Sequence, residues 1–263
     1  EERLTFIHPE TIAGVFSYAQ SRVAEEGLYA IVDVGAGTTD VSFFRLADLP
    51  QRQLSIYAAR TRIVGADNID RAVLDKFLST PELREEVQRL EPGDILQQVR
   101  LAKENLSKNS YISIRLSHKA LRIGMGEFEK IASPIVQQIF THYKNTGRKA
   151  YEKEKNIERW RRYSLFLLGG GSRLQAVDRI LRKPPPQIEE VRVRKIPIPE
   201  DIGVGAKGGG LLLDDYRFLA VAYGLSFHPA QIPKILSPSE VEPLVIKLPT
   251  KVVLDRDELY PKR

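Results

Sequence analysis

The sequence contains no cysteine among its 263 residues, which excludes disulfide bonds and thiolate metal sites and agrees with a reducing compartment such as the cytoplasm. Its four histidines are scattered, so the sequence offers no histidine metal site; they are His8, His118, His142 and His228. No run of about twenty apolar residues occurs, so no membrane-spanning helix is expected.

What is present is the composition of a globular protein with a substantial core, 42% hydrophobic and 28% charged. The net charge is +6, and much of the basic excess lies in residues 144–162, interleaved with glutamates. Mixed charge of this kind indicates an exposed helix face rather than a nucleic-acid site. We expect Trp160 and Tyr163 to seat that helix against a sheet.

Residues 30–44, AIVDVGAGTTDVSFF, combine a buried strand, a turn of small residues and several polar groups. Residues 28–34 and 41–46 predict two strands of a β-hairpin. In the turn between them, backbone N–H groups can approach and surround an anion, as a phosphate site requires; its residues are Gly35, Ala36 and Gly37, followed by the Thr38 hydroxyl.

Two carboxylates flank this turn, Asp33 at the end of the first strand and Asp40 at the start of the second. Phosphates would repel them unless a cation stood between, so the pair predicts a magnesium ion held by Asp33 and Asp40 through its water ligands. The alternative is a plain hairpin with a glycine turn.

A second glycine-rich turn follows a short predicted strand at 165–168, and a third predicted strand covers 54–64. Gly169, Gly170 and Gly171 lead into a helical pattern at 173–181, for which Ser172 is the expected N-cap. Such a turn can accept a nucleotide, but glycines at a bend of this type also serve packing.

The segment DVGAGTTDVSFF resembles the second phosphate motif of the Hsp70, actin and sugar-kinase superfamily of ATPases, and FLLGGGSRL resembles its adenosine motif. The resemblance implies that Asp33 orders magnesium-bound water and that Asp40 orients the attacking water. It places the nucleotide phosphates on Gly35, Ala36, Gly37 and Thr38, and the nucleoside on Gly169, Gly170, Gly171 and Arg173. Ala36 stands where glycine is common in Hsp70 proteins, and an alanine is tolerated there only if its φ is negative. Gly171 replaces a serine.

Further segments narrow the resemblance to Hsp70 proteins. GADNIDRAVLDKF, from residue 65, implies that Gly65 lies near the phosphates at a helix start. The segment at 99–114 resembles a nucleotide-facing helix that brings Lys103 and Ser107 to adenosine, although a solvated lysine also fits Lys103. Arg100 and Glu104 depart from the family pattern there.

The two ends of the ATPase-like region carry looser matches. Residues 7–20 resemble the segment between the family's two lobes, with Glu10 at the position of a catalytic glutamate; an N-terminal helix with an acidic first turn fits equally. Residues 217–227 resemble the closing helix of the second lobe, with Phe218 in place of an aspartate.

The expected fold is an α/β, actin-like (ribonuclease H-like) ATPase lobe, in which helices flank a mixed sheet and a smaller α+β subdomain is inserted. Residues 1–65 and 164–227 would form the core, 66–163 the insertion, and 228–263 a Pro-rich tail extended across the surface. The insertion would contain strands at 111–116 and 120–125 and a helix pair meeting at residues 133 and 134.

The resemblance implies one lobe of an Hsp70-like ATPase that binds ATP or ADP with Mg²⁺ against a first lobe absent from this chain, which is then a fragment. Hydrolysis would need that lobe, so this chain alone is expected to be inactive. Expected partners are nucleotide, the first lobe, and protein clients or co-chaperones. The alternatives are an actin-like filament or plasmid-partition ATPase and a non-catalytic interaction module; a sugar kinase is less favoured, because nothing resembles a sugar-binding acid.

Overall fold

The computed structural model describes residues 10–49, 51–104, 111–115, 120–184, 188–199, 202 and 213–241. A six-stranded mixed sheet with strand order β7-β6-β1-β2-β3-β8 forms its centre. The strands are β1 (Gly27–Val34), β2 (Thr39–Ala47), β3 (Gln53–Arg62), β6 (Arg162–Leu168), β7 (Glu190–Arg194) and β8 (Ile235–Leu236). The predicted strands at 28–34, 41–46, 54–64 and 165–168 are confirmed, with ends that differ by a few residues.

Two strand pairings in this sheet bring the glycine turns together. β1 and β2 form the predicted antiparallel hairpin, whereas β1 and β6 run parallel, with Asp33 opposite Leu168. Because parallel strands end at the same edge of a sheet, the turns after β1 and β6 lie side by side.

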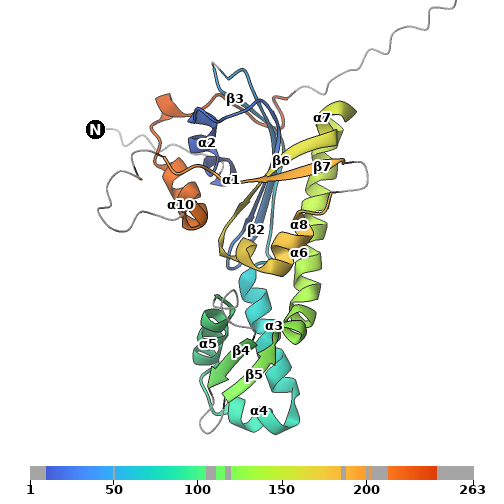
Figure 1. The fold of residues 1–263 in the computed structure, drawn as a ribbon, viewed down its shortest axis with the longest axis vertical. Coiled ribbons are helices and arrows are strands. Elements are labelled where there is room, and N and C mark those ends of the chain that lie inside the picture. Colours follow the sequence, from blue (N-terminus) through green and yellow to red (C-terminus); the bar gives the residue numbers. More distant parts are fainter. Residues whose placement is uncertain are drawn as a thin grey trace, which may run out of the picture.

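Helices cover both faces of the sheet, because alternate β1 residues are buried in different directions. Tyr29 and Ile31 pack with α1 (Glu10–Ala13), α2 (Phe16–Gln20) and α10 (Leu213–Leu225). Ala30 and Val32 belong to the cluster formed with α6 (Met125–Lys153), α7 (Ile157–Arg161) and α8 (Gln175–Leu181). Figure 1 shows these two groups on opposite sides of the sheet. The predicted mixed sheet with flanking helices is confirmed.

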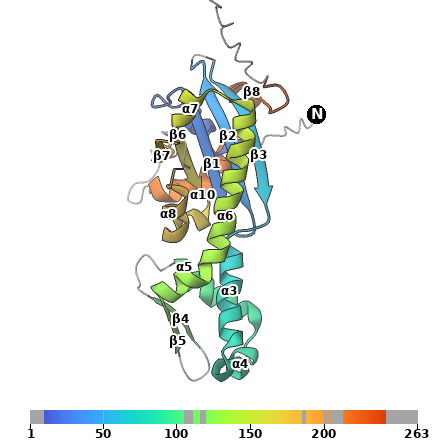
Figure 2. The same cartoon turned by 90° about the vertical axis from the view of Figure 1, so that its right-hand side faces the viewer.

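A smaller α+β part extends beyond one end of the sheet (Figure 1). It contains α3 (Ala66–Ser79), α4 (Pro81–Gln88), α5 (Pro92–Glu104) and the antiparallel pair β4 (Tyr111–Arg115) and β5 (Ala120–Gly124). α6 runs from this part up along the main sheet (Figure 2), where the Tyr143 ring stacks on Phe43 at 5.6 Å. The division at residues 66 and 163 stays a prediction, since α6 packs against both parts.

The predicted helix pair around residues 133 and 134 is wrong, because α6 is one helix of 29 residues with Pro134 inside it. A proline inside a helix costs about 3 kcal/mol, because it lacks an N–H and crowds the preceding turn. Buried residues on both sides of Pro134 offset this cost; they include Phe128, Ala132, Val136 and Ile139.

Three other boundaries differ from expectation. The helix resemblance over 99–114 holds only to Glu104 within the described residues. The strands predicted at 111–116 and 120–125 are confirmed as β4 and β5, and Ile112 and Ile114 of β4 are buried with a strand's period of two. The helix expected from 173 begins at Gln175, after the 3₁₀ turn η1 (Gly170–Arg173). The tail contributes β8, which pairs with β3 at the sheet edge instead of only crossing the surface.

Ser172 is therefore not the N-cap of α8. Its hydroxyl donates to the Gly169 carbonyl at 2.7 Å, and its side chain is fully buried. None of the described helices is long and apolar enough to cross a membrane.

Candidate nucleotide site

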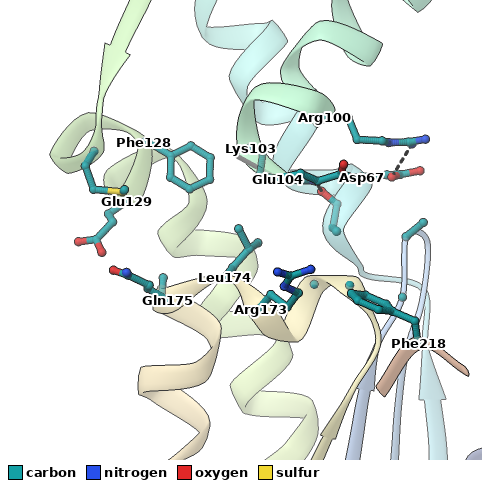
Figure 3. A pocket seen from close by; sticks show the side chains of 17 residues that line it. Asp67, Arg100, Lys103, Glu104, Phe128, Glu129, Arg173, Leu174, Gln175 and Phe218 are labelled. Atoms are coloured by element: carbon teal, nitrogen blue, oxygen red, sulfur yellow. Dashed lines mark hydrogen bonds and ion pairs between the residues drawn. The ribbon is translucent and has the colours of Figure 1, made fainter. Parts of the chain in front are cut away.

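A cavity of about 500 Å³ opens where β1 and β6 end, and both glycine turns line it. Gly35 and Ala36 come from the first turn, and Gly170 and Gly171 from the second. In Figure 3, Arg100, Lys103, Glu104 and Asp67 lie on one side of the cavity, opposite Arg173, Leu174, Gln175 and Phe218. Two turns far apart in the sequence therefore converge on one cleft, as the resemblance requires if they hold the phosphates and the nucleoside of one nucleotide.

The second turn packs directly on the end of β1, and only glycine fits there. Gly169 has φ +72°, and a Cβ added to it would lie 2.3 Å from Asp33 Oδ1. A Cβ on Gly171 would lie 2.5 Å from Val34 Cγ1. These contacts explain how the two turns come close enough to share one cavity.

The first turn rests on the N-terminus of α3. The Ala66 amide donates to Gly35 O at 3.0 Å and the Asp67 amide to Ala36 O at 2.8 Å. Gly65 permits this approach, because a Cβ there would lie 2.4 Å from Ala36 O.

The orientation of these carbonyls determines where the turn's own amides point. All described peptide bonds are trans, so each N–H points opposite to the preceding carbonyl. Because Gly35 O and Ala36 O face α3, the Ala36 and Gly37 amides point away from it. Ala36 has the negative φ that a non-glycine residue needs here. The turn therefore presents donors suited to an anion.

Three carboxylates gather beside the cavity, although they do not line it. Burial and the negative charges of Asp40 and Glu10 raise the pKa of Asp33 to about 6. Asp40 accepts hydrogen bonds from Thr38 Oγ1 at 3.2 Å and from the Thr61 hydroxyl.

The chemistry of this acidic group suits a hydrated divalent cation. Burial is the largest cause of the raised pKa of Asp33, and repulsion from Asp40 and Glu10 adds to it. A cation would offset both effects. Across the described part of the chain, no group of three or more His, Cys, Asp or Glu side chains could hold a metal ion. A cation held through its water ligands is consistent with both findings.

The far wall pairs a cation with an aromatic ring. The Arg173 guanidinium lies 5.6 Å from the centroid of the Phe218 ring and 3.8 Å from Asp215 Oδ1. In the sequence, Phe218 stood out only as the replacement of an aspartate, and its place in the cavity wall was missed. A signal was available, since Tyr216 and Ala220 define the buried face of α10 and Phe218 lies off it, 42% exposed.

The opposite wall comes from α5, whose charged residues are paired with α3. Arg100 contacts Asp67 at 2.9 Å, and Lys103 contacts Asp70. Lys103 is only 7% exposed, so the interpretation as a solvated lysine is wrong. Sequence reasoning missed Asp70, although it neighbours Ile69 on the buried face of α3. Ser107 lies outside the described residues.

The family model described as "Hsp70 protein" matches residues 6–187. This chain belongs to the Hsp70 family. It is 29% identical over 227 residues to the "Chaperone protein HscA homolog" of Burkholderia multivorans, covering 81% of this chain and 34% of that protein. It is 29% identical over 239 residues to the homologue from Acidithiobacillus ferrooxidans, covering 86% of this chain and 37% of that protein. The chain thus spans about a third of the length of these relatives.

The Hsp70-family fold brings most of the predicted site residues to one place. The cavity is lined by Gly35, Ala36, Lys103, Gly170, Gly171 and Arg173. Beside it lie Glu10, Asp33 and Asp40, which interact electrostatically, and Thr38, which is bonded to Asp40. Gly65 and Gly169 allow the close backbone contacts that shape the turns.

Proposed function

We propose that this chain is the second lobe of the nucleotide-binding domain of an Hsp70-family ATPase and binds ATP or ADP with Mg²⁺. The observation that supports this most strongly is the convergence of two glycine turns on one cavity, with interacting carboxylates beside the first turn. The cavity volume, about 500 Å³, lies within the range typical of small-molecule sites.

In this proposal the Ala36 and Gly37 amides and the Thr38 hydroxyl hold the phosphates. Gly170, Gly171 and Arg173 hold the nucleoside, with Phe218 behind the Arg173 side chain.

The acidic group would serve the cation and the water. Asp33 and Asp40 would hold Mg²⁺ through its water ligands, and the ion would supply positive charge against the phosphoryl group. The Thr61 hydroxyl fixes the Asp40 carboxylate, which then orients the attacking water in line with the terminal phosphate. The Thr38 hydroxyl has one hydrogen, which it donates to Asp40 in this structure, and it would turn that hydrogen to the phosphates when they bind. Glu10 lies close enough to affect Asp33 and completes the group from α1.

Catalysis of this kind depends on positioning and electrostatic stabilisation, so it needs both walls of a closed site. We therefore propose that hydrolysis requires a first lobe and that this chain alone hydrolyses ATP slowly. Since the two relatives from Burkholderia multivorans and Acidithiobacillus ferrooxidans are named chaperones, we further propose that the full-length protein works on protein clients with co-chaperones.

Calorimetry on the full-length protein tests the nucleotide proposal. We expect ADP to bind with Mg²⁺ and the Asp33→Asn variant to bind Mg-ADP at least tenfold more weakly. Asp75→Asn makes the same chemical change at an exposed position of α3 and should leave the affinity unchanged. Absence of ADP and ATP binding by the full-length protein would favour a non-catalytic interaction module and overturn the proposal.

A further inference from the structure

A buried ion pair lies behind the wall that α5 contributes to the cavity. Lys103 Nζ is 2.7 Å from Asp70 Oδ1 and 2.8 Å from Asp70 Oδ2. Asp70 is 2% exposed and Lys103 7% exposed, so both groups are removed from water. Charges buried in this way persist only when they are well paired, so the contact fixes α5 against α3.

The hydrogen-bonding capacity of the Lys103 ammonium is directed into the protein. Two of the three N–H donors of this ammonium group make hydrogen bonds, to Asp70 Oδ2 at 2.8 Å and to the Ala66 carbonyl at 3.2 Å. Asp70 Oδ1 lies 2.7 Å away as an ion-pair contact and accepts no hydrogen bond from the described residues. The charge of the ammonium group is likewise compensated by Asp70. Lys103 thus borders the cavity with two of its donors and its charge already taken up by protein groups, which is a poor arrangement for a direct ligand of the nucleoside.

The same lysine is connected to the phosphate-binding turn through one residue. Ala66 receives the Lys103 hydrogen bond at its carbonyl, and its own amide donates to Gly35 O. The next amide, that of Asp67, donates to Ala36 O. The first residues of α3 are thus bonded to the turn on one side and to Lys103 on the other.

We propose that Lys103 and Asp70 are positioning residues for the phosphate-binding turn. They hold the start of α3 in place, and α3 in turn keeps the Ala36 and Gly37 amides directed at the phosphates. Lys103 then contributes to the affinity for phosphates and not to that for the nucleoside, unlike the direct adenosine contact that the family resemblance implies. The part played by phosphates rests on the proposed nucleotide function.

A series of ligands that differ only in phosphates tests this assignment in the full-length protein. Calorimetry would compare adenosine, AMP and ADP, with Mg²⁺ present. For Lys103→Met we expect an adenosine affinity within twofold of the wild type and an ADP affinity at least tenfold lower. Equal losses for adenosine and ADP would mean that Lys103 touches the nucleoside, and no loss for either would mean that it positions nothing; both overturn the proposal.

Within the described residues, the single variant leaves the buried Asp70 carboxylate with only a longer ion pair, to Arg100 Nε at 3.9 Å, and this loss can prevent folding. The double variant Asp70→Asn/Lys103→Met removes that charge as well and should show the same contrast between adenosine and ADP. Lys155→Met is the matched control, since Lys155 is exposed and does not line the cavity. It should bind all three ligands as the wild type does.

A measurement without nucleotide separates this proposal from the proposed function. Hydrogen exchange at the Ala66 and Asp67 amides, followed by NMR, reports whether α3 still bonds to the turn. Both Lys103 variants should exchange at these amides at least tenfold faster than the wild type, and Lys155→Met should not. Unchanged protection would overturn the positioning role even if nucleotide binds, whereas a wild type that binds no nucleotide refutes only the proposed function.

Discussion

Replacing Asp33 by asparagine should stabilise the metal-free protein while weakening the site. Asp33 has a pKa of about 6 in the folded protein, raised from 3.8 by burial and by the charges of Asp40 and Glu10. The folded state therefore binds this proton more tightly than the unfolded state. Protonation of Asp33 therefore stabilises the folded state fully below pH 3.8, and this stabilisation is lost as the pH rises through 6.

The size of the effect follows from the shift. At 1.36 kcal/mol per pH unit, ionised Asp33 destabilises the folded state at pH 8 by up to ~3 kcal/mol when no cation is bound. Asparagine has nearly the same shape and no charge. We expect Asp33→Asn to raise the free energy of unfolding by about 1 to 3 kcal/mol at pH 8, with the gain vanishing near pH 4.

Urea unfolding in EDTA between pH 4 and pH 8 measures this difference. The fluorescence of Trp160 is a suitable probe, because it is this chain's only tryptophan and is 6% exposed. Asp75→Asn controls for the loss of a carboxylate and should leave stability unchanged at every pH. A gain that does not depend on pH, or a loss at pH 8, would refute the account in which burial and neighbouring carboxylates destabilise ionised Asp33.

Two other substitutions probe the packing and the far wall of the cavity. Gly224→Ala should lower the free energy of unfolding by about 1 to 3 kcal/mol, because its Cβ would lie 1.8 Å from Ala13 O and force α10 away from α1. In urea unfolding Gly93→Ala, where the added Cβ meets nothing within 4 Å, should change stability little; equal effects would contradict this reasoning. Phe218→Ala removes the ring beneath Arg173 and should weaken adenosine and ADP binding by the same factor, roughly 3 to 10, in calorimetry. A loss for ADP alone would show that Phe218 does not serve the nucleoside.

The sheet and its two turns were predictable because their signals are local. Short apolar runs that end at glycine are typical of buried strands, and the polar residues of each turn directly follow its strand. That the turns share a cavity follows from one further fact, the parallel pairing of β1 with β6. No sequence pattern predicted this pairing, because strand periodicity does not specify which strands are neighbours.

The rest depends on contacts between distant segments, which a local pattern does not reveal. Pro134 is a strong helix breaker by itself, and only the burial of α6 on both sides of it keeps the helix continuous. Lys103 has the local pattern of an exposed helix residue, because its partner Asp70 is 33 positions away. Phe218 reaches the cavity from α10, far along the chain from both turns.

The origin of the cavity walls also determines what a bound ligand would do to the protein. One wall belongs to α3 and α5 of the smaller part, and the other to η1 and α10 on the main sheet. A ligand that contacts both walls favours the arrangement in which the distance between the walls matches the width of the ligand. The free energy of this preference equals the difference between the ligand's binding free energies for the two arrangements. The buried pair of Asp70 and Lys103 makes α3 and α5 move together, so such a ligand would act on the smaller part as one unit. The phosphate-binding turn is bonded to α3, and any such movement would therefore reach the amides that face the phosphates.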